Sequence, residues 1–336
     1  MSQSSAAVSA PNAGQAEPDG IEQFQHWLLR SPTVSRVLII GVPLLGMLAS
    51  LGLQARTAVV SGSVLFKQQE LIGLPSREMR RLRGSQVGMI FQDPLSSLNP
   101  VMTVGAQIRE ALLLHNGGLG KKQATERVVE LLRLVAIPQP DRRISQYPHE
   151  FSGGMRQRVM IAMAIANNPE LLVADEPTTA LDVTVQAQIM RMLRELKEKL
   201  GLALVLITHD LGVVAGHADR VAVIYAGLVV EEAEVRELFV NPRHPYTRGL
   251  IASIPQLTSS KNKLYSIPGS PPMLGDLPDG CAFHPRCSFA RDVCRRVSPP
   301  TIGVGGRHRS ACHFADNLPA WNGAAQDAML EGADHG

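Results

Sequence analysis

The feature that most constrains the fold is the alternation, between residues 61 and 233, of short apolar runs with segments of helical periodicity. Four runs have the length and composition of buried strands: Val87–Phe91, Leu171–Ala174, Leu202–Ile207 and Val221–Tyr225. Three segments have the periodicity of helices: Ala124–Val135, Met155–Ile165 and Val183–Leu200. Buried strands that alternate with helices predict an α/β fold with a mainly parallel sheet and helices on both faces.

The two ends of the chain differ from this middle part. Residues 1–36 form an atypical N-terminus whose first part, rich in Ser, Ala, Gly and Pro, is predicted to be disordered. After about Asn241 prolines recur, strand-like runs stop, and all four cysteines follow residue 280. The sequence therefore predicts an α/β domain over residues 37–236 and a smaller C-terminal unit over residues 237–336.

Composition argues against several classes of protein. The net charge of +3, the lack of a Lys/Arg block and the aromatic content of 4% disfavour a nucleic-acid partner. The first 280 residues contain no cysteine, which is not the composition of a secreted, disulfide-stapled scaffold. Apolar content of 45% and charged content of 19% are ordinary for a chain with a sizeable core.

One uncharged segment, Val37–Leu53, reaches the lower limit of length for a membrane span. It contains three glycines and a proline, and acidic residues weaken the positive charge that should precede a signal anchor. A buried strand-turn-helix inside the core is therefore favoured, with a membrane span as the alternative.

Two carboxylates follow the apolar run Leu171–Ala174. Ligands of such sheets bind beyond the carboxyl ends of the strands, so Asp175 and Glu176 are expected to point into a site. Asp175 would hold Mg²⁺, mostly through water, and Glu176 would polarise the water that attacks a γ-phosphate. For the pair taken alone, solvated turn acids are the less favoured alternative.

Three further motifs accompany the carboxylates. Ser152–Gly154 opens a predicted helix and presents bare backbone N–H groups, with the positive end of the helix dipole, to an anion. His209 follows the run Leu202–Ile207, where it can hydrogen-bond a γ-phosphate and the attacking water. Gln92 follows Val87–Phe91 and can reach Mg²⁺ and water with its amide.

In this order and spacing, the motifs resemble those of the ABC ATPases. The residues that match are Gln92 (Q-loop), Ser152, Gly153 and Gly154 (signature motif), Asp175 and Glu176 (Walker B), Asp182 (D-loop) and His209 (H-loop). The resemblance implies that Glu176, His209 and Gln92 are catalytic. It also implies that the residues that bind ATP and Mg²⁺ include Asp175, Gln92, Ser152, Gly153, Gly154 and Asp182.

The resemblance narrows to the ATPases of oligopeptide and dipeptide importers, and it covers roughly residues 61–316. The segments that narrow it are Phe91–Pro100, Tyr147–Glu150, Asn241–Tyr246 and the closing cysteine segment. It implies an ABC-type nucleotide-binding domain with a helical subdomain, followed by a C-terminal extension. The implied partners are a second ABC ATPase subunit, two transmembrane permease subunits and, indirectly, a peptide-binding protein, at the cytoplasmic face of the inner membrane.

The phosphate-binding loop of that family, G-x-x-x-x-G-K-[ST], is missing from the sequence. Counting back from Gly62–Phe66 places it near residues 37–44, which read VLIIGVPL. A shifted reading, Gly41–Leu48, keeps two glycines but puts Met47 and Leu48 where Lys and Ser/Thr belong. The lysine for the β/γ-phosphates and the hydroxyl for Mg²⁺ are therefore absent.

This loss has two explanations. In the first, residues 1–60 derive from a shifted reading frame or a rearranged gene start. In the second, the subunit is genuine and has a degenerate site. The first is favoured because a whole region is lost rather than one residue. The predicted function is that of an ATP-hydrolysing subunit that energises a peptide importer. The alternative is a catalytically degenerate subunit that supplies Ser152–Gly154 to an intact neighbour. A third reading, a non-transport ABC ATPase acting on nucleic acid, is disfavoured because it would need coiled-coil heptads or a basic stripe, and the sequence contains neither.

The four cysteines, Cys281, Cys287, Cys294 and Cys312, are spaced C-x5-C-x6-C-x17-C. Zinc ribbons usually pair cysteines at shorter spacings, so this pattern fits zinc poorly. Four thiolates in a reducing compartment suit a [4Fe–4S] cluster, and the resemblance points to the same group. Zinc and unligated buried thiols stay open as alternatives.

Overall fold

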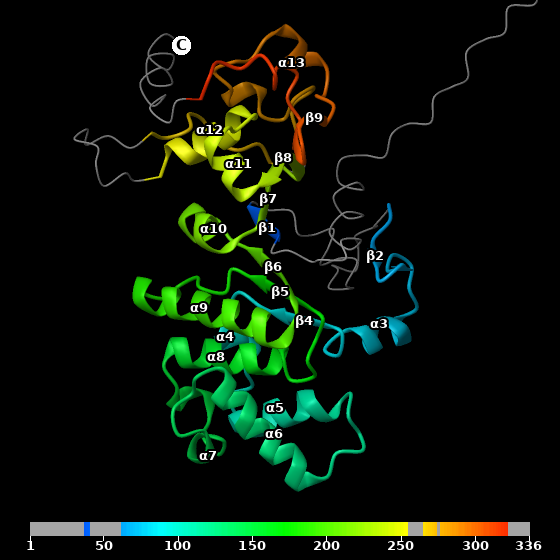
Figure 1. Cartoon of the computed structure of the whole chain (residues 1–336), viewed down its shortest axis with the longest axis vertical. Helices are drawn as coiled ribbons and strands as arrows, with labels where there is room; N and C mark the ends of the chain where they lie inside the picture. The colour runs from blue at the N-terminus through cyan, green and yellow to red at the C-terminus, as the bar shows by residue number, and fades with distance from the viewer. Residues whose placement is uncertain (1–36, 41–61, 255–264, 274–275, 322–336) are drawn as a thin grey trace, which may run out of the picture.

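A mixed β-sheet forms the centre of the molecule in the computed structural model, which describes residues 37–40, 62–254, 265–273 and 276–321. Within these residues the sheet has eight strands in the order β4-β5-β6-β1-β7-β8-β10-β9 (Figure 1). The strands are β1 (Val37–Ile40), β4 (Val87–Ile90), β5 (Leu171–Asp175), β6 (Ala203–Ile207), β7 (Arg220–Tyr225), β8 (Leu228–Glu234), β9 (Ile302–Gly305) and β10 (His308–Ser310). The pairs from β4 to β7 are parallel, and the pairs from β7 to β9 are antiparallel. The predicted mainly parallel α/β sheet is confirmed.

Some helices flank the sheet, and others form a separate group at one end of the molecule. They are α3 (Ser76–Leu82), α4 (Pro94–Ser97), α5 (Val104–Leu113), α6 (Lys121–Leu134), α7 (Pro140–Arg143), α8 (Gly153–Ala164), α9 (Val183–Leu200), α10 (Leu211–His217), α11 (Val235–Val240), α12 (Pro245–Ala252) and α13 (Asp292–Arg296). Figure 1 shows α5, α6 and α7 together at one end of the long axis, where they form the predicted helical subdomain, and α13 and β9 at the other end. A small hairpin, β2 (Leu65–Phe66) with β3 (Gln69–Glu70), lies beside α3.

The alternation of side chains along the strands divides the core between the two faces of the sheet. Leu172 and Leu204 belong to a large cluster that includes buried residues of α8 and α9. Their neighbours Val173 and Val205 belong to a second cluster, which α3 and the β2–β3 hairpin cover. Strands buried on both faces explain why the sequence shows them as unbroken apolar runs.

Strand β1 lies in the middle of the sheet, where Val37 pairs with Val205 of β6 and with Arg220 of β7. Of the stretch 37–44, where counting back places the missing phosphate loop, residues 37–40 form a strand. A strand at Val37–Ile40 also excludes a membrane-spanning helix that begins at Val37. The shifted reading Gly41–Leu48 and the rest of Val37–Leu53 lie outside the described residues. Among the helices of the described part, none is long and apolar enough to cross a membrane.

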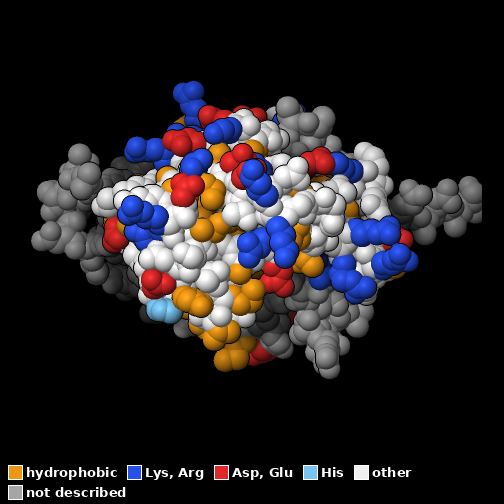
Figure 2. Space-filling view, turned by 90° about the horizontal axis from the view of Figure 1, so that it is seen from below, with side chains coloured by type: hydrophobic (Ala, Val, Ile, Leu, Met, Phe, Trp, Pro, Cys, Tyr) orange, Lys and Arg blue, Asp and Glu red, His pale blue; other side chains and the backbone are white. Residues whose placement is uncertain are grey.

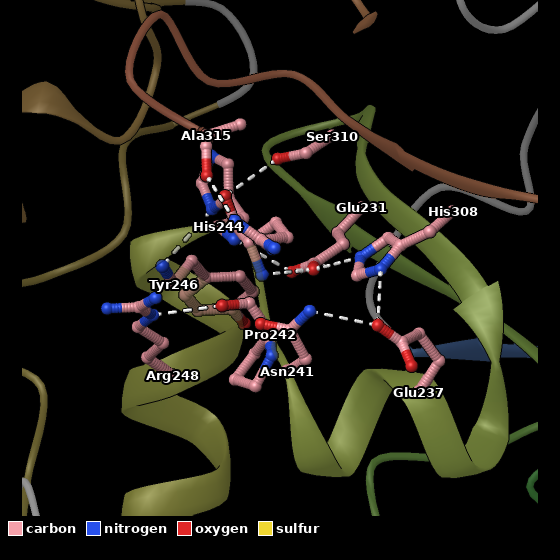
Figure 3. A network of polar contacts seen from close by, with 11 residues as sticks. Glu231, Glu237, Asn241, Pro242, His244, Tyr246, Arg248, His308, Ser310 and Ala315 are labelled. Atoms are coloured by element: carbon pink, nitrogen blue, oxygen red, sulfur yellow. Dashed lines mark hydrogen bonds and ion pairs between the residues drawn. The ribbon is translucent and has the colours of Figure 1, made fainter. Parts of the chain in front are cut away.

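The C-terminal unit continues the sheet. The expectation that strands stop after about Asn241 is wrong, because β10 pairs with β8 and β9 pairs with β10. Both strands are short and contain few apolar residues, so they give no strand-length apolar run. Figure 3 shows the junction, where Glu231 of β8 lies next to His308 of β10 and the loop before α12.

Candidate functional site

Three side chains that the sequence predicts to be catalytic meet at one edge of the sheet. Gln92 follows β4, Glu176 follows β5 and His209 follows β6, and these three strands are parallel neighbours. Because parallel strands end at the same edge, residues more than 30 positions apart come together there. The structure thus brings Gln92, Glu176 and His209 together, and their catalytic roles remain a prediction.

Glu176 is the centre of this group. Its Oε2 accepts hydrogen bonds from Gln92 Nε2 at 2.9 Å and from Thr179 Oγ1 at 2.8 Å. Its Oε1 lies 3.0 Å from Nδ1 of His209, whose side chain is 74% exposed. Thr179 was not predicted as a site residue, and its hydroxyl reaches the Glu176 side chain because the turn after β5 brings the two residues together.

The backbone of Glu176 is held in an unusual conformation. Its φ is +43°, in the left-handed region that costs a non-glycine residue on the order of 1–2 kcal/mol. Its N–H donates to the carbonyl of Ile207 at 3.0 Å, and its carbonyl accepts from the N–H of Thr179 at 3.1 Å. Strain that neighbouring elements enforce is typical of functional positions, because it fixes where the side chain points.

The two adjacent carboxylates have pKa values shifted in opposite directions. Burial raises the pKa of Asp175, and the neighbouring charge of Glu176 raises it further. Burial also raises the pKa of Glu176, but hydrogen bonds from Thr179, His209 and Gln92 outweigh it and leave that pKa below its usual value. Glu176 is thus an ionised acceptor at neutral pH, and a cation beside Asp175 would favour the ionised form of that carboxyl.

The signature residues lie against the start of α9. Ser152 is the N-cap of α8 and is exposed, and its side chain does not cap the helix. A Cβ added to Gly154 would lie 2.6 Å from Cγ1 of Val185, and one added to Gly153 would lie 3.6 Å from Cδ2 of Leu181. Packing therefore also requires a glycine at position 154, because the missing side chain lets α8 approach α9 closely. The sequence alone did not reveal this requirement.

Asp182 has a structural role as the N-cap of α9. Its side chain accepts a hydrogen bond from the N–H of Val185 at 2.9 Å. Asp210 caps α10 in the same way and also accepts from Nε2 of Gln186 at 3.0 Å. The predicted contact of Asp182 with ATP remains a prediction.

The four cysteines are free thiols that lie close enough to affect one another. The pKa of Cys287 is raised to about 12 and that of Cys312 to about 11. Burial is the main cause and the neighbouring thiols add to it, whereas one backbone hydrogen bond to each sulfur lowers the pKa. The N–H of Cys281 donates to the carbonyl of Cys294 at 2.8 Å, which joins two of the cysteine segments. Among the described side chains, no group of three or more His, Cys, Asp or Glu is arranged to hold a single metal ion.

Three basic residues near the cysteines in the described structure interact with protein groups other than the thiols. Arg286 donates to the carbonyls of Pro268 and Ile267, and Arg291 lies over the ring of Phe314 at 4.1 Å. His308 is bound to Glu231. These three side chains are thus held by other partners.

Comparison with known proteins gives two family matches. Residues 47–179 match the family "ABC transporter", and residues 230–294 match "Oligopeptide/dipeptide transporter, C-terminal region". The first match begins at residue 47, so it leaves out nearly all of the region in which the phosphate loop was sought.

Relatives that match most of the chain belong to the same kind of transporter. The chain is 54% identical over 248 residues to the oligopeptide transport ATP-binding protein OppD of Bacillus subtilis, covering 74% of this chain and 69% of the relative. It is 51% identical to OppD of Salmonella typhimurium over 270 residues, which is 80% of each chain. It is also 51% identical to the dipeptide transport ATP-binding protein DppD of Lactococcus lactis over 259 residues, which is 77% of this chain and 74% of the relative.

The fold is also similar to solved structures. One of them is a dimeric post-hydrolysis state of the ATP-binding cassette MJ0796 bound to ADP and Pi. The TM-score is 0.53 at 29% identity, and the match covers 62% of this chain and 88% of the other. This confirms the predicted ATP-binding cassette fold.

Proposed function

The chain belongs to the family of ATP-binding subunits of oligopeptide and dipeptide ABC transporters, and we propose that it energises the import of peptides. The observation that carries the proposal is the group around Glu176. Gln92, Thr179 and His209 orient its two oxygens at the edge of the sheet where a nucleotide of this family of folds binds. Glu176 is oriented as a general base would be in this chain's own half-site, but that half-site lacks the lysine of a phosphate loop, so hydrolysis is proposed to depend on the partner's half-site.

ATP with Mg²⁺ is the proposed cofactor pair. Asp175 is half-buried and burial raises its pKa, which fits a position next to a divalent cation, and Gln92 lies one strand away. The cation would neutralise charge on the phosphates. Ser152 and Gly153 are exposed at the start of a twelve-residue helix, and together with Gly154 they present backbone N–H groups that suit an anionic phosphate.

We infer that the working unit is a pair of ABC subunits in which this chain supplies only part of the machinery. The solved cassette MJ0796 forms a dimer, and the signature residues here lie against α9 rather than beside Glu176. A phosphate held at Ser152 therefore comes from a nucleotide bound by another subunit. Because this chain lacks the lysine of the phosphate loop, an intact partner subunit would contribute that loop.

Membrane subunits are the other proposed partners, with this chain peripheral at the cytoplasmic face and a peptide-binding protein delivering the substrate. The described surface offers apolar contact area after β4, where Leu95 is 67% and Val101 is 79% exposed. Figure 2 shows hydrophobic side chains gathered along one side of the helical end, among interspersed basic and acidic side chains.

A [4Fe–4S] cluster is the cofactor we propose for Cys281, Cys287, Cys294 and Cys312. Burial, with a smaller contribution from neighbouring thiols, raises the pKa values of Cys281, Cys287 and Cys312, so bound metal would be needed to keep these three thiols ionised. The spacing C-x5-C-x6-C-x17-C fits zinc poorly, whereas the cysteine spacing of [4Fe–4S] sites varies among families.

Transport by the assembled complex tests this function. The chain is expressed with its membrane subunits and second ATPase subunit, purified and placed in proteoliposomes with the binding protein. We expect ATP-dependent peptide uptake that disappears when this chain is omitted. Full uptake without the chain, or failure of the chain to join the complex, would contradict the proposal.

A further inference from the structure

Two aromatic side chains, those of Tyr147 and His149, lie a few positions before the signature residues, and their rings stack on each other. The ring centroids are 5.7 Å apart, and the ring planes differ by 13°. Both residues are exposed, Tyr147 to 40%, and Ser152 and Gly153 are exposed as well. An exposed aromatic pair therefore lies close in the chain to the helix start that suits a phosphate.

The stacked pair is fixed to helix α8, at whose start the signature residues lie. A 3₁₀ turn begins at Pro148 and ends at Glu150, two positions before Ser152. The side chain of Glu150 accepts a hydrogen bond from the N–H of Tyr147 at 2.7 Å. From α8, Nε of Arg156 donates to the carbonyl of Pro148 at 2.8 Å. The two rings and the start of α8 thus form one structural unit.

Tyr147 lies within reach of a nucleotide whose terminal phosphate meets Ser152. Five residues of chain span at most about 18 Å when fully extended, and the 3₁₀ turn between the two positions shortens this distance. Such a nucleotide carries an aromatic base at its other end, and every base can stack on an aromatic ring because it has a π-face. The phosphate and the base of one nucleotide can therefore meet the same structural unit.

We propose that the ring of Tyr147 stacks on the base of the nucleotide whose phosphate lies at the signature residues Ser152–Gly154. His149 is a positioning residue in this arrangement, because its ring covers one face of Tyr147 and the exposed part of Tyr147 receives the base. The proposal rests on the function proposed above, in which the phosphate loop of the partner subunit holds this nucleotide. It adds that this chain also recognises the nucleoside part, across the interface between the two subunits.

The test is the KM for ATP of the reconstituted complex, which contains the intact second ATPase subunit. Tyr147→Ala should raise KM about tenfold, which is the size of effect expected for one lost base–aromatic stack, and should change kcat little. Tyr147→Phe keeps the ring and should keep the KM. His149→Ala should raise KM by a smaller factor. Leu114→Ala, which removes a side chain that is 74% exposed on another element, is the control and should leave KM unchanged.

Inhibition by tripolyphosphate, which has phosphates but no base, separates stacking from a general effect on the site. Its inhibition constant should be the same for the unchanged complex and for Tyr147→Ala. An equal loss of affinity for tripolyphosphate would overturn the proposal, and so would loss of the membrane subunits from the variant complex, which indicates a protein contact. A normal KM in Tyr147→Ala, with hydrolysis abolished in Ser152→Arg, removes the stacking alone. If Ser152→Arg leaves hydrolysis unchanged, the use of the signature residues proposed above fails, and the stacking fails with it.

Discussion

Glu231 of β8 and His308 of β10 are joined by a hydrogen bond of 2.7 Å between buried side chains. The same carboxylate accepts from the backbone N–H groups of Arg243 and His244, just before α12 (Figure 3). The buried carboxylate of Glu231 thus connects β8, on which it lies, with β10 and with the loop before α12 through hydrogen bonds. Ser310 adds a hydrogen bond of 2.9 Å to the carbonyl of Arg243.

Replacing Glu231 should therefore loosen the C-terminal unit. Glu231→Ala leaves three donors without an acceptor, which should cost about 3–5 kcal/mol. Hydrogen exchange should then increase in β10 and in residues 242–248, while β5 and β6 stay protected. The exposed Glu234, on the same strand, provides the matched control Glu234→Ala. Uniform exchange across the whole sheet would show that Glu231 does not act locally.

The sequence predicts best those features whose signals are local. Helix α9 has the predicted bounds because Asp182 caps its first turn and Gly201, with φ +64°, ends it. The meeting of Gln92 with Glu176 also follows from the sequence, because parallel buried strands must end at a common edge.

The missed features depend on contacts between distant segments. His308 reaches Glu231 across 77 positions, and the polar strands β9 and β10 carry no apolar pattern. Gly154 looked like a phosphate-binding residue, and its closeness to Val185 depends on how two helices pack. Neither relationship leaves a periodic signal in the chain.

The isolated chain should bind ATP weakly and hydrolyse it negligibly. Loss of the lysine and hydroxyl of the phosphate loop removes preorganised contacts, which should lower the rate by about 10²-fold or more. Calorimetry and single-turnover assays on the purified chain, with the intact second ATPase subunit as the control, measure both effects. Ordinary micromolar affinity for ATP would contradict this account.

Asp175 should make stability depend on pH. Its folded pKa is raised by burial and by Glu176, so its ionisation destabilises the fold as pH rises from the unfolded pKa through the folded one. Asp175→Asn should then raise the melting temperature at pH 7 in Mg²⁺-free buffer and leave it unchanged well below the unfolded pKa. An equal gain at both pH values would mean that charge is not the cause.

Anaerobically purified protein should be brown and contain iron and sulfide. Cys312→Ser should remove the colour and destabilise the C-terminal unit, because the bound cluster contributes folding free energy. Ser288→Ala, at an exposed position beside Cys287, is the control and should keep the colour. Stoichiometric zinc without sulfide would rule out the cluster.

The central claim is that the chain acts through its signature motif at a site whose phosphate loop belongs to the partner. The most direct test is ATP hydrolysis by the reconstituted complex with single substitutions in this chain. Ser152→Arg places a bulky cation where backbone N–H groups must approach phosphate, and it should abolish activity. Glu176→Gln, in the half-site that lacks a lysine, should leave most of the activity. If Glu176→Gln abolishes hydrolysis and Ser152→Arg spares it, this chain's own half-site is the working one and the account is wrong.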